Sequence, residues 1–315
     1  MSQPRLIFDR PLLRERHLRA QALGPSTFLI DRVAQDLADR LAAVVRRFEC
    51  AVDLGTPTDA LCRQLARSGK IDILVAAGRS AADRFTGLAA LRREQSPAFR
   101  LAIAGDEEAL PFRDGSLDLV VSALSLQFVN DLPGTLVQIC RALRPDGLLL
   151  AALVGGDSLT ELRECFAAAE AETEGGISPH VIPFVDVRAA GALLQRTGFA
   201  LPVADLDRIT VRYSSPMVLM HDIRAMGATN PLIERSRHPL KRATLRRMIE
   251  LYGQRFADPD RRIRATFEIV WLSGWAPHSS QQKPLAPGSA RQRLADALGA
   301  REITITGEGQ PGEDR

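Results

Sequence analysis

Between residues 48 and 155, short apolar runs alternate with stretches of helical periodicity, and no other feature restricts the fold as much. The apolar runs lie at residues 50–54, 71–76, 101–104, 117–124 and 148–154, and helical patterns occupy residues 59–68 and 132–143. Strands separated by helices at this spacing indicate βαβ units and a parallel sheet. Runs that are apolar almost throughout are typical of strands covered on both faces. The predicted fold class is therefore α/β, a doubly wound and mostly parallel sheet of the Rossmann type.

The chain on either side of this core divides into further regions. Residues 1–47 are predicted to be an N-terminal helical segment, with an apolar stripe that includes Leu29, Val33 and Leu37. Residues 48–155 form the Rossmann core. Residues 156–278 are interpreted as the C-terminal part of the fold with insertions on the substrate side, with helices predicted at 158–174, 186–197, 217–226 and 240–256 and strands at 205–213 and 264–275. Residues 279–315 are predicted to be a flexible tail.

Charge and cysteine content exclude some classes of function. The chain has 41 basic and 38 acidic residues, so total charge gives no reason to expect a nucleic-acid partner. Its four cysteines show no CxxC spacing, which favours free thiols in a reduced compartment, and the expected location is cytoplasmic. No apolar run approaches roughly 18 residues, so no transmembrane segment is predicted. The basic helix predicted at 240–256 is interpreted as a solvated surface, and the alternatives are a partner surface or a peripheral contact with the inner face of an anionic membrane.

The segment between the first predicted strand and its helix reads D-L-G-T-P-T-D, from Asp53 to Asp59. In a doubly wound sheet, ligands bind in the crevice at such strand ends. Glycines in this position let a cofactor approach the backbone closely. The segment resembles the D-L-G-x-G-x-G loop of class I S-adenosylmethionine-dependent methyltransferases.

Three more segments resemble the same family in the correct order. The chain reads D-E-E-A-L-P-F at residues 106–112, L-D-L-V-V at residues 117–121 and R-P-D-G at residues 144–147, before the fifth predicted strand. The resemblance implies S-adenosylmethionine as the cofactor, and it implies that Asp106 accepts a hydrogen bond from the adenine amine. The implied cofactor-binding residues are Asp53, Gly55, Thr56, Asp106, Glu107 and Ser122.

The loop departs from the family pattern at three positions. Pro57 and Asp59 replace the second and third glycines, and Ala77 stands where the family has an acidic residue that binds the ribose hydroxyls; Asp72 or Asp83 is the match in another register. Proline removes a backbone N–H group and fixes φ, and the Asp59 carboxylate would repel the carboxylate of the cofactor. The sequence therefore predicts that S-adenosylmethionine binding is weakened or lost.

A longer resemblance runs through the C-terminal half. The chain reads G-G-D-S-L-T-E-L-R at residues 155–163, A-E at 169–170 and G-G-I-S-P-H-V-I-P-F at 175–184. These segments are similar to the signature of the complex I assembly factor 5 family, as are I-F-D-R at residues 7–10 and Met226-Gly227 followed by Asn230. The similarity covers roughly residues 5–291, and the chain resembles a bacterial member of that family.

This resemblance implies an enzyme that modifies a protein. The family is methyltransferase-like, and its mitochondrial member is described as hydroxylating an arginine in a quinone-proximal subunit of NADH:ubiquinone oxidoreductase (complex I). The implied function is methyl transfer to, or arginine hydroxylation of, a protein side chain in complex I assembly, with a complex I subunit as partner. Two alternatives stay open: a non-catalytic assembly module on the same fold, and the malonyl carrier-protein methyltransferase of biotin synthesis.

Four residues are candidates for substrate chemistry. His180 is the candidate catalytic residue, as a general base, and with Ser178 it is a candidate for substrate binding; the alternative is a histidine that only locks its loop. Asp157 and Arg163 are the other predicted substrate-binding residues, and their alternative is a helix cap with a solvated face. No metal site is predicted, because none of the five histidines stands in an H-x-D/E pair.

Overall fold

The computed structural model describes residues 6–78, 99–282 and 299. The chain divides into two compact units, Met1–His278 and Ser279–Arg315. The predicted flexible tail at 279–315 therefore lies almost wholly outside the described residues. None of the helices in the described part is long and apolar enough to cross a membrane.

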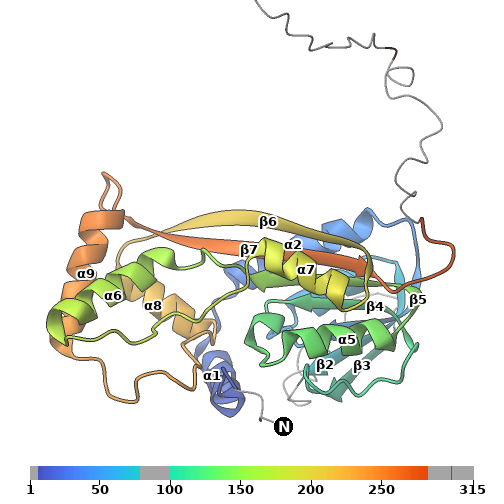
Figure 1. Cartoon of the computed structure of the whole chain (residues 1–315), viewed down its shortest axis with the longest axis horizontal. Coiled ribbons are helices and arrows are strands. Elements are labelled where there is room, and N and C mark those ends of the chain that lie inside the picture. The colour runs from blue at the N-terminus through green and yellow to red at the C-terminus, as the bar shows by residue number, and fades with distance from the viewer. Residues whose placement is uncertain (1–5, 79–98, 283–298, 300–315) are drawn as a thin grey trace, which may run out of the picture. The chain divides into compact units, whose positions relative to one another are not determined.

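The strands of the described residues form one sheet in the order β3-β2-β1-β4-β5-β7-β6 (Figure 1). Strands β1 to β5 run parallel, and β7 pairs antiparallel with both β5 and β6. The prediction of a doubly wound, mostly parallel sheet is confirmed. The strands are β1 Phe48–Leu54, β2 Ile71–Gly78, β3 Phe99–Ala104, β4 Leu117–Ala123, β5 Leu143–Val154, β6 Ala200–Tyr213 and β7 Ile263–Trp275.

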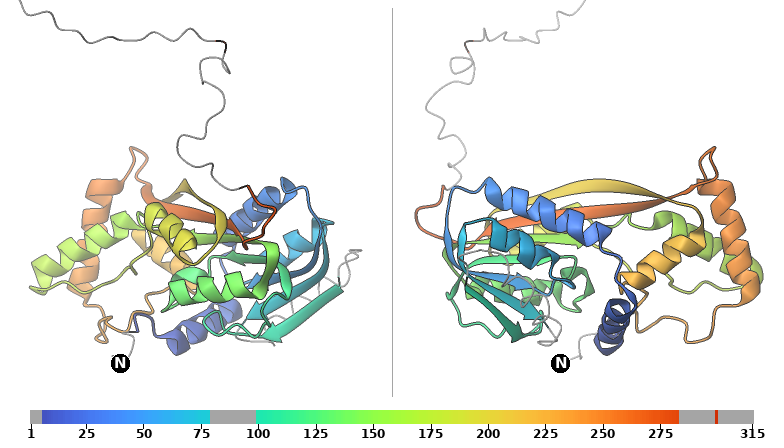
Figure 2. Two further views of the ribbon diagram at one scale, coloured as in Figure 1. Left: turned by 45° about the vertical axis from the view of Figure 1, so that its right-hand side comes forward. Right: turned by 180° about the vertical axis from the view of Figure 1, so that it is seen from behind.

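Helices cover both faces of the sheet. Successive strand residues point to opposite faces, so that an apolar strand presents apolar side chains to the helices on each side. Ala51 and Leu119 belong to the core cluster beneath α2 and α3, whereas Val52 and Val120 belong to the cluster beneath α5 and α7. Figure 2 shows α2 and α3 together on one face. The helices are α1 Arg10–Leu23, α2 Phe28–Ala42, α3 Ala60–Arg67, η1 Leu126–Phe128, α5 Leu132–Ala142, α6 Thr160–Thr173, α7 Val187–Arg196, α8 Pro216–Ala225 and α9 Arg242–Phe256.

Strands β6 and β7 extend beyond the parallel strands, and α6, α8 and α9 gather around this extension (Figure 1). The second half of β7 pairs with β5 up to Ile269, whereas residues 263–268 pair only with β6. Along residues 263–268, the other edge of β7 bonds with the segment after β5. Glu268 O accepts from Gly155 N at 2.7 Å, and Thr266 O accepts from Leu159 N at 2.7 Å.

The start of α6 differs from the prediction. The sequence predicts a helix from residue 158 capped by Asp157 or Ser158, but α6 begins at Thr160, after Leu159 in a left-handed conformation and without a side-chain cap. Ser158 Oγ instead accepts from Glu268 N at 2.8 Å, and Glu161 accepts from Thr266 N at 3.1 Å and from the Thr266 hydroxyl at 2.6 Å. The capping prediction was wrong, because the Ser158 and Glu161 side chains accept hydrogen bonds from backbone N–H groups of β7.

Truncation of Leu37 tests how far α2 stabilises the fold. Its side chain is 1 % exposed in the core cluster beneath α2 and α3. We expect Leu37→Ala to lower the free energy of unfolding by about 2–5 kcal/mol, because the removed methyl groups leave a cavity. The control Val45→Ala removes apolar atoms from a fully exposed side chain and should change stability by less than about 0.5 kcal/mol. Urea denaturation measures both, and equal losses would contradict the placement of α2.

Candidate functional site

The cofactor-type loop is held by hydrogen bonds to the neighbouring strands. Gly55 has a φ of 74°, which favours glycine, and its N–H donates to Ala77 O at 2.8 Å. Thr56 Oγ1 accepts from Ala123 N at 3.2 Å, and Ser122 Oγ donates to Leu54 O at 2.8 Å. Both hydroxyl side chains are fully buried. They fix the loop between β2 and β4, so the structure places Thr56 and Ser122 beneath the crevice surface.

Asp53 ties the end of β1 to the following helix. Its side chain is fully buried, and its Oδ2 accepts a hydrogen bond from the Cys62 thiol at 2.9 Å. A signal for this pair exists in the sequence, because Cys62 lies on the inward face of α3, beside Leu61 and Leu65.

The space above Gly55 is taken by two side chains. A Cβ atom at Gly55 would lie 2.5 Å from Glu107 Oε1 and closer still to Ser125 Oγ. These two side chains also bond to each other, with Ser125 Oγ donating to Glu107 Oε1 at 3.3 Å. A side chain larger than that of glycine would therefore overlap both groups. In this arrangement, Glu107 and Ser125 cover the predicted cofactor loop.

An arginine of the N-terminal helix binds three consecutive acids, the first of which, Asp106, is the predicted adenine-side residue. Arg10, 9 % exposed, forms ion pairs with Asp106 Oδ1 at 2.8 Å, with Glu108 Oε2 at 2.8 Å and with Glu107. The sequence does not indicate this role, although Arg10 ends the I-F-D-R motif. Its partners lie almost a hundred residues away in the chain, and sequence spacing does not reveal such contacts.

The residues that depart from the methyltransferase loop pattern lie in different surroundings. Asp59 pairs with Arg63 at 3.0 Å, so its charge is partly neutralised. Ala77 is buried opposite Leu54, near the end of β2. The alternative Asp72 was wrong, because it lies at the start of β2, away from the crevice, and pairs with Arg47 at 3.0 Å. The other alternative, Asp83, lies outside the described residues.

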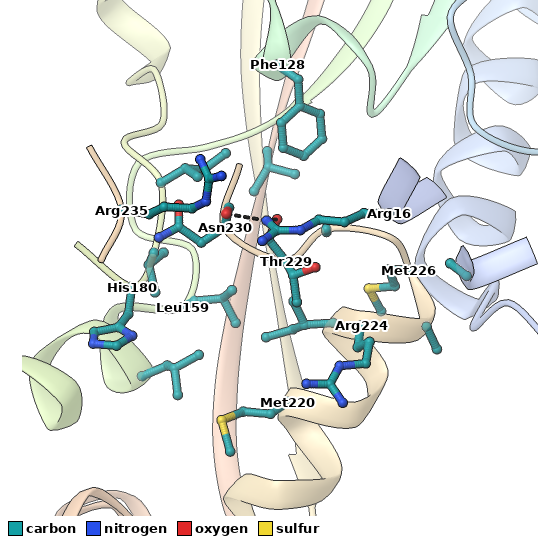
Figure 3. Close-up of a pocket in the computed structure, with 18 of the residues that line it drawn as sticks. Arg16, Phe128, Leu159, His180, Met220, Arg224, Met226, Thr229, Asn230 and Arg235 are labelled. Atoms are coloured by element: carbon teal, nitrogen blue, oxygen red, sulfur yellow. Dashed lines mark hydrogen bonds between the residues drawn. The ribbon is translucent and has the colours of Figure 1, made fainter. Parts of the chain in front are cut away.

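Next to the loop lies a cavity of about 760 Å³. Pro57 and Thr58 of the loop line one side, α1 and α8 contribute further walls, and residues 178–184 close another side. Figure 3 shows that Arg16, His180 and Arg224 reach the cavity from different elements. A volume of this size is typical of sites for small molecules or for a long side chain.

His180 and Ser178 share one carboxylate in the wall of this cavity. His180 Nε2 lies 2.7 Å from Glu170 Oε1, which also accepts from Ser178 Oγ at 2.7 Å, and Glu170 Oε2 accepts from Ser178 N at 2.6 Å. The His180 ring stacks on Phe166 with centroids 4.0 Å apart. Burial acts to raise the pKa of Glu170, but the hydrogen bonds from Ser178 and His180 together hold it below its usual value. The carboxylate therefore fixes the orientation of the imidazole.

Three motifs that are distant in sequence meet around the cavity. Asn230 Nδ2 donates to Pro179 O at 2.6 Å, and Arg16 donates to Thr229 O at 2.7 Å and to Asn230 O. Asp9 N donates to Pro231 O at 2.8 Å. The N-terminal motif, the segment after α8 and the loop with His180 thus form one hydrogen-bonded wall, and the sequence alone gives no sign that these segments meet.

The other two predicted substrate residues lie elsewhere. Asp157 is exposed and pairs with Arg208 at 2.5 Å, and the Arg163 guanidinium bonds to Ser158 O at 3.4 Å. Neither residue lines the cavity. The structure brings together Ser178 and His180 and separates them from Asp157 and Arg163. In the part of the chain that the structure describes, no group of three or more histidine, cysteine, aspartate or glutamate side chains is placed so that it could hold a metal ion.

The lowered pKa of Glu170 predicts a pH-dependent contribution to stability. A carboxylate with a folded-state pKa below its unfolded value stabilises the fold above the unfolded pKa, and this contribution disappears as pH falls through the folded pKa. We expect Glu170→Gln to unfold at lower urea concentration than the wild type at pH 7, with the difference shrinking below about pH 4. The same measurement on Glu164→Gln, at an exposed position of the same helix, controls for loss of charge. A difference for Glu170→Gln that does not depend on pH would contradict the assigned hydrogen bonds.

Comparison with known proteins agrees with this architecture. A family model described as "Methyltransferase domain" matches residues 52–151. Among solved structures, a putative methyltransferase from Bacillus halodurans superposes with a TM-score of 0.54 at 15% identity, covering 77% of this chain and 99% of that one. The YcgJ protein from Bacillus subtilis gives a TM-score of 0.54 at 11% identity, covering 78% of this chain and 99% of that one. These similarities establish the fold.

Sequence relatives are similar over most of the chain at a higher identity. "Malonyl-[acyl-carrier protein] O-methyltransferase" of Laribacter hongkongensis is 35% identical over 71% of this chain and 72% of its own length. "Arginine-hydroxylase NDUFAF5, mitochondrial" is 35% identical in Danio rerio, over 92% of this chain and 89% of the relative. The Homo sapiens protein of the same name is 36% identical over 90% of this chain and 81% of the relative. Because these relatives are 35% and 36% identical over 92% and 90% of the chain, the chain belongs to the NDUFAF5 family of methyltransferase-fold proteins.

Proposed function

We propose that this chain modifies an arginine side chain of a protein, a subunit of respiratory complex I, at the cavity beside the cofactor-type loop. The observation that carries the proposal is similarity to proteins named arginine hydroxylases over about nine-tenths of the chain. The choice of complex I as the partner rests on the resemblance of the I-F-D-R and G-G-I-S-P-H-V-I-P-F motifs to the assembly-factor family. The expected location is the cytoplasm, at the inner face of the membrane where that partner resides.

The chemistry of the cavity supports a role for His180 as a proton acceptor. Its imidazole is oriented by Glu170 at 2.7 Å, which is the arrangement that prepares a histidine to accept a proton. Ser178 hydrogen-bonds to the same carboxylate and would help to position the substrate chain. Hydroxylation adds one oxygen atom and consumes dioxygen and a two-electron donor, both supplied from outside the chain's own side chains. The described residues would bind and orient the arginine and move a proton.

We also infer that S-adenosylmethionine binds weakly. The inference rests on Pro57 in the loop, on Ala77 at the end of β2 and on the Glu107 side chain above Gly55. The methyltransferase fold is present, but Glu107 and Ser125 would have to move before the loop backbone could contact a cofactor. For this reason no step of the proposed reaction is assigned to that cofactor.

Glu107 offers a test of this inference. We expect the wild type to bind S-adenosylmethionine with a Kd above about 1 μM in isothermal titration, and Glu107→Ala to bind about tenfold more tightly because the space above Gly55 opens. Glu108→Ala is the matched control, since it also loses a carboxylate that pairs with Arg10 but does not reach Gly55. Sub-micromolar binding by the wild type, or equal gains in both variants, would contradict weak binding caused by Glu107.

Mass spectrometry of complex I tests the proposed function. In cells that contain the protein, an arginine of the quinone-proximal subunit should carry the mass of one added oxygen atom, and deletion of the gene should remove it. His180→Ala should reduce the modification by about 10²–10⁴-fold in rate, the usual contribution of a general base. His238→Ala, another histidine of the cavity wall, is the control. The mass of one added methylene group would instead establish methyl transfer. An arginine that is unmodified in cells with the protein, together with failed assembly of complex I after deletion, would establish a non-catalytic assembly module.

A second candidate function is malonyl carrier-protein O-methylation, which the Laribacter hongkongensis relative supports at 35% identity. The two candidates differ in the phenotype that follows from deletion of the gene. Loss of malonyl methylation would make cells dependent on biotin and leave complex I intact. Loss of the proposed activity would lower complex I activity without a biotin requirement.

A further inference from the structure

One arginine of α1 lies among three carboxylates beside the cofactor-type loop. Arg10 forms ion pairs with Asp106 Oδ1 at 2.8 Å, with Glu108 Oε2 at 2.8 Å and with Glu107. The side chains of Arg10 and Glu107 are each 10 % exposed. Salt and water screen a charge pair much less at this depth than on the surface. This ion pair is therefore a strong constraint on the position of the Glu107 side chain.

The acids depend on this cation in order to lie together. Residues 106–108 are consecutive acids in the sequence, so their carboxylates repel one another. A buried carboxylate that loses its cation is also destabilised by the loss of water around it. The hydrogen bond from Ser125 Oγ to Glu107 Oε1, at 3.3 Å, is long for a hydroxyl donor. Without Arg10, the Glu107 side chain would favour a position turned towards solvent.

The same arginine engages both acids that matter for a cofactor. Asp106 is the residue to which the methyltransferase resemblance assigns the adenine amine, and its Oδ1 contacts Arg10. Glu107 is the side chain whose Oε1 would lie 2.5 Å from a Cβ atom at Gly55. A cofactor that used Asp106 and approached Gly55 would have to displace contacts that Arg10 maintains.

Arg10 belongs to a helix that is packed lightly. Within α1 the buried residues are Arg10, Leu13 and Ala20. Leu13 belongs with Phe8 to a small apolar cluster that is separate from the two core clusters of the sheet. The helix ends at Gly24, which has a φ of 89° and open space where a Cβ atom would lie. The start of α1 can therefore open locally while the core of the sheet stays packed.

We propose that α1 is an autoinhibitory lid on the cofactor-type crevice, with Arg10 as the positioning residue that holds Glu107 over Gly55. Binding of S-adenosylmethionine and the ion pairs of Arg10 exclude each other, so the cofactor binds only when the start of α1 is released. The proposal rests on the weak cofactor binding inferred under the proposed function, and it names the group that regulates that binding.

Substitution of Arg10 tests the lid by isothermal titration of the full-length protein with S-adenosylmethionine. Arg10→Gln should bind about tenfold more tightly than the wild type, because release of Glu107 opens the space above Gly55. Arg10→Gln combined with Glu107→Ala should bind no more tightly than Glu107→Ala alone, because the two changes remove the same obstruction. Arg10→Lys keeps the cation and should gain less than Arg10→Gln.

The control is Arg14→Gln, which removes the same charge from an exposed position of the same helix and should leave the Kd unchanged. Circular dichroism establishes that each variant is folded. A purely structural role for Arg10 would appear as lower stability with unchanged or weaker binding, and this result would overturn the lid. Additive gains in the combined variant would also overturn it, because Arg10 would then not act through Glu107.

Hydrogen exchange of the wild-type protein gives a second readout that needs no substitution. At a concentration of S-adenosylmethionine well above its Kd, the amides of residues 13–23 should exchange faster, because α1 loses the ion pairs that hold its start. The amides of α5 are the internal reference and should not exchange faster. Unchanged or slower exchange in α1 would overturn the proposal.

The titrations separate failure of the lid from failure of the inference on which it rests. Sub-micromolar binding by the wild type would contradict weak cofactor binding and the lid together. Weak binding by the wild type that Arg10→Gln does not improve would overturn the lid alone and leave weak binding in place.

Discussion

The extension of β7 beyond β5 is the constraint on which the substrate side of this protein depends. Along residues 263–268 only one edge of β7 is paired with a strand, and backbone groups on a covered edge must find other partners. The segment from Gly155 to Glu161 supplies them, through two backbone N–H groups, the Ser158 hydroxyl and the Glu161 carboxylate. This segment acts in place of a strand, and α6 begins where it ends.

Gly155 shows how closely the segment approaches the strand. A Cβ atom there would lie 2.5 Å from Glu268 Oε1. The family signature at residues 155–161 is thus explained by the architecture, and its polar residues need no ligand to account for them. The same arrangement directs α6 away from the sheet, so that Phe166 and Glu170 form a wall of the cavity.

The sequence predicted what depends on local pattern. Alternating apolar runs revealed the parallel sheet, and the loop at Gly55 revealed the crevice, because strand and turn preferences involve neighbouring residues. The sequence did not predict the partners of Ser158 or Arg10. A hydroxyl near the start of a helix can cap that helix or bond to a distant strand, and the residue pattern is the same in both cases. The acids that pair with Arg10 are likewise distant in sequence. For His180 the sequence left catalysis and loop locking open, and the structure adds Glu170 as its orienting partner.

Helix α1 touches both the crevice and the cavity. Arg10 binds the acids at residues 106–108, and Arg16, about 9 Å further along the helix, reaches the cavity wall. The methyltransferase domain recognised by sequence begins only at residue 52. A fragment that begins there would cut into β1 and lose both arginines. Three adjacent carboxylates would then lack their shared cation, and the cavity would lack one side. The part of the chain needed to build the crevice and the cavity is therefore larger than the domain that sequence comparison delimits.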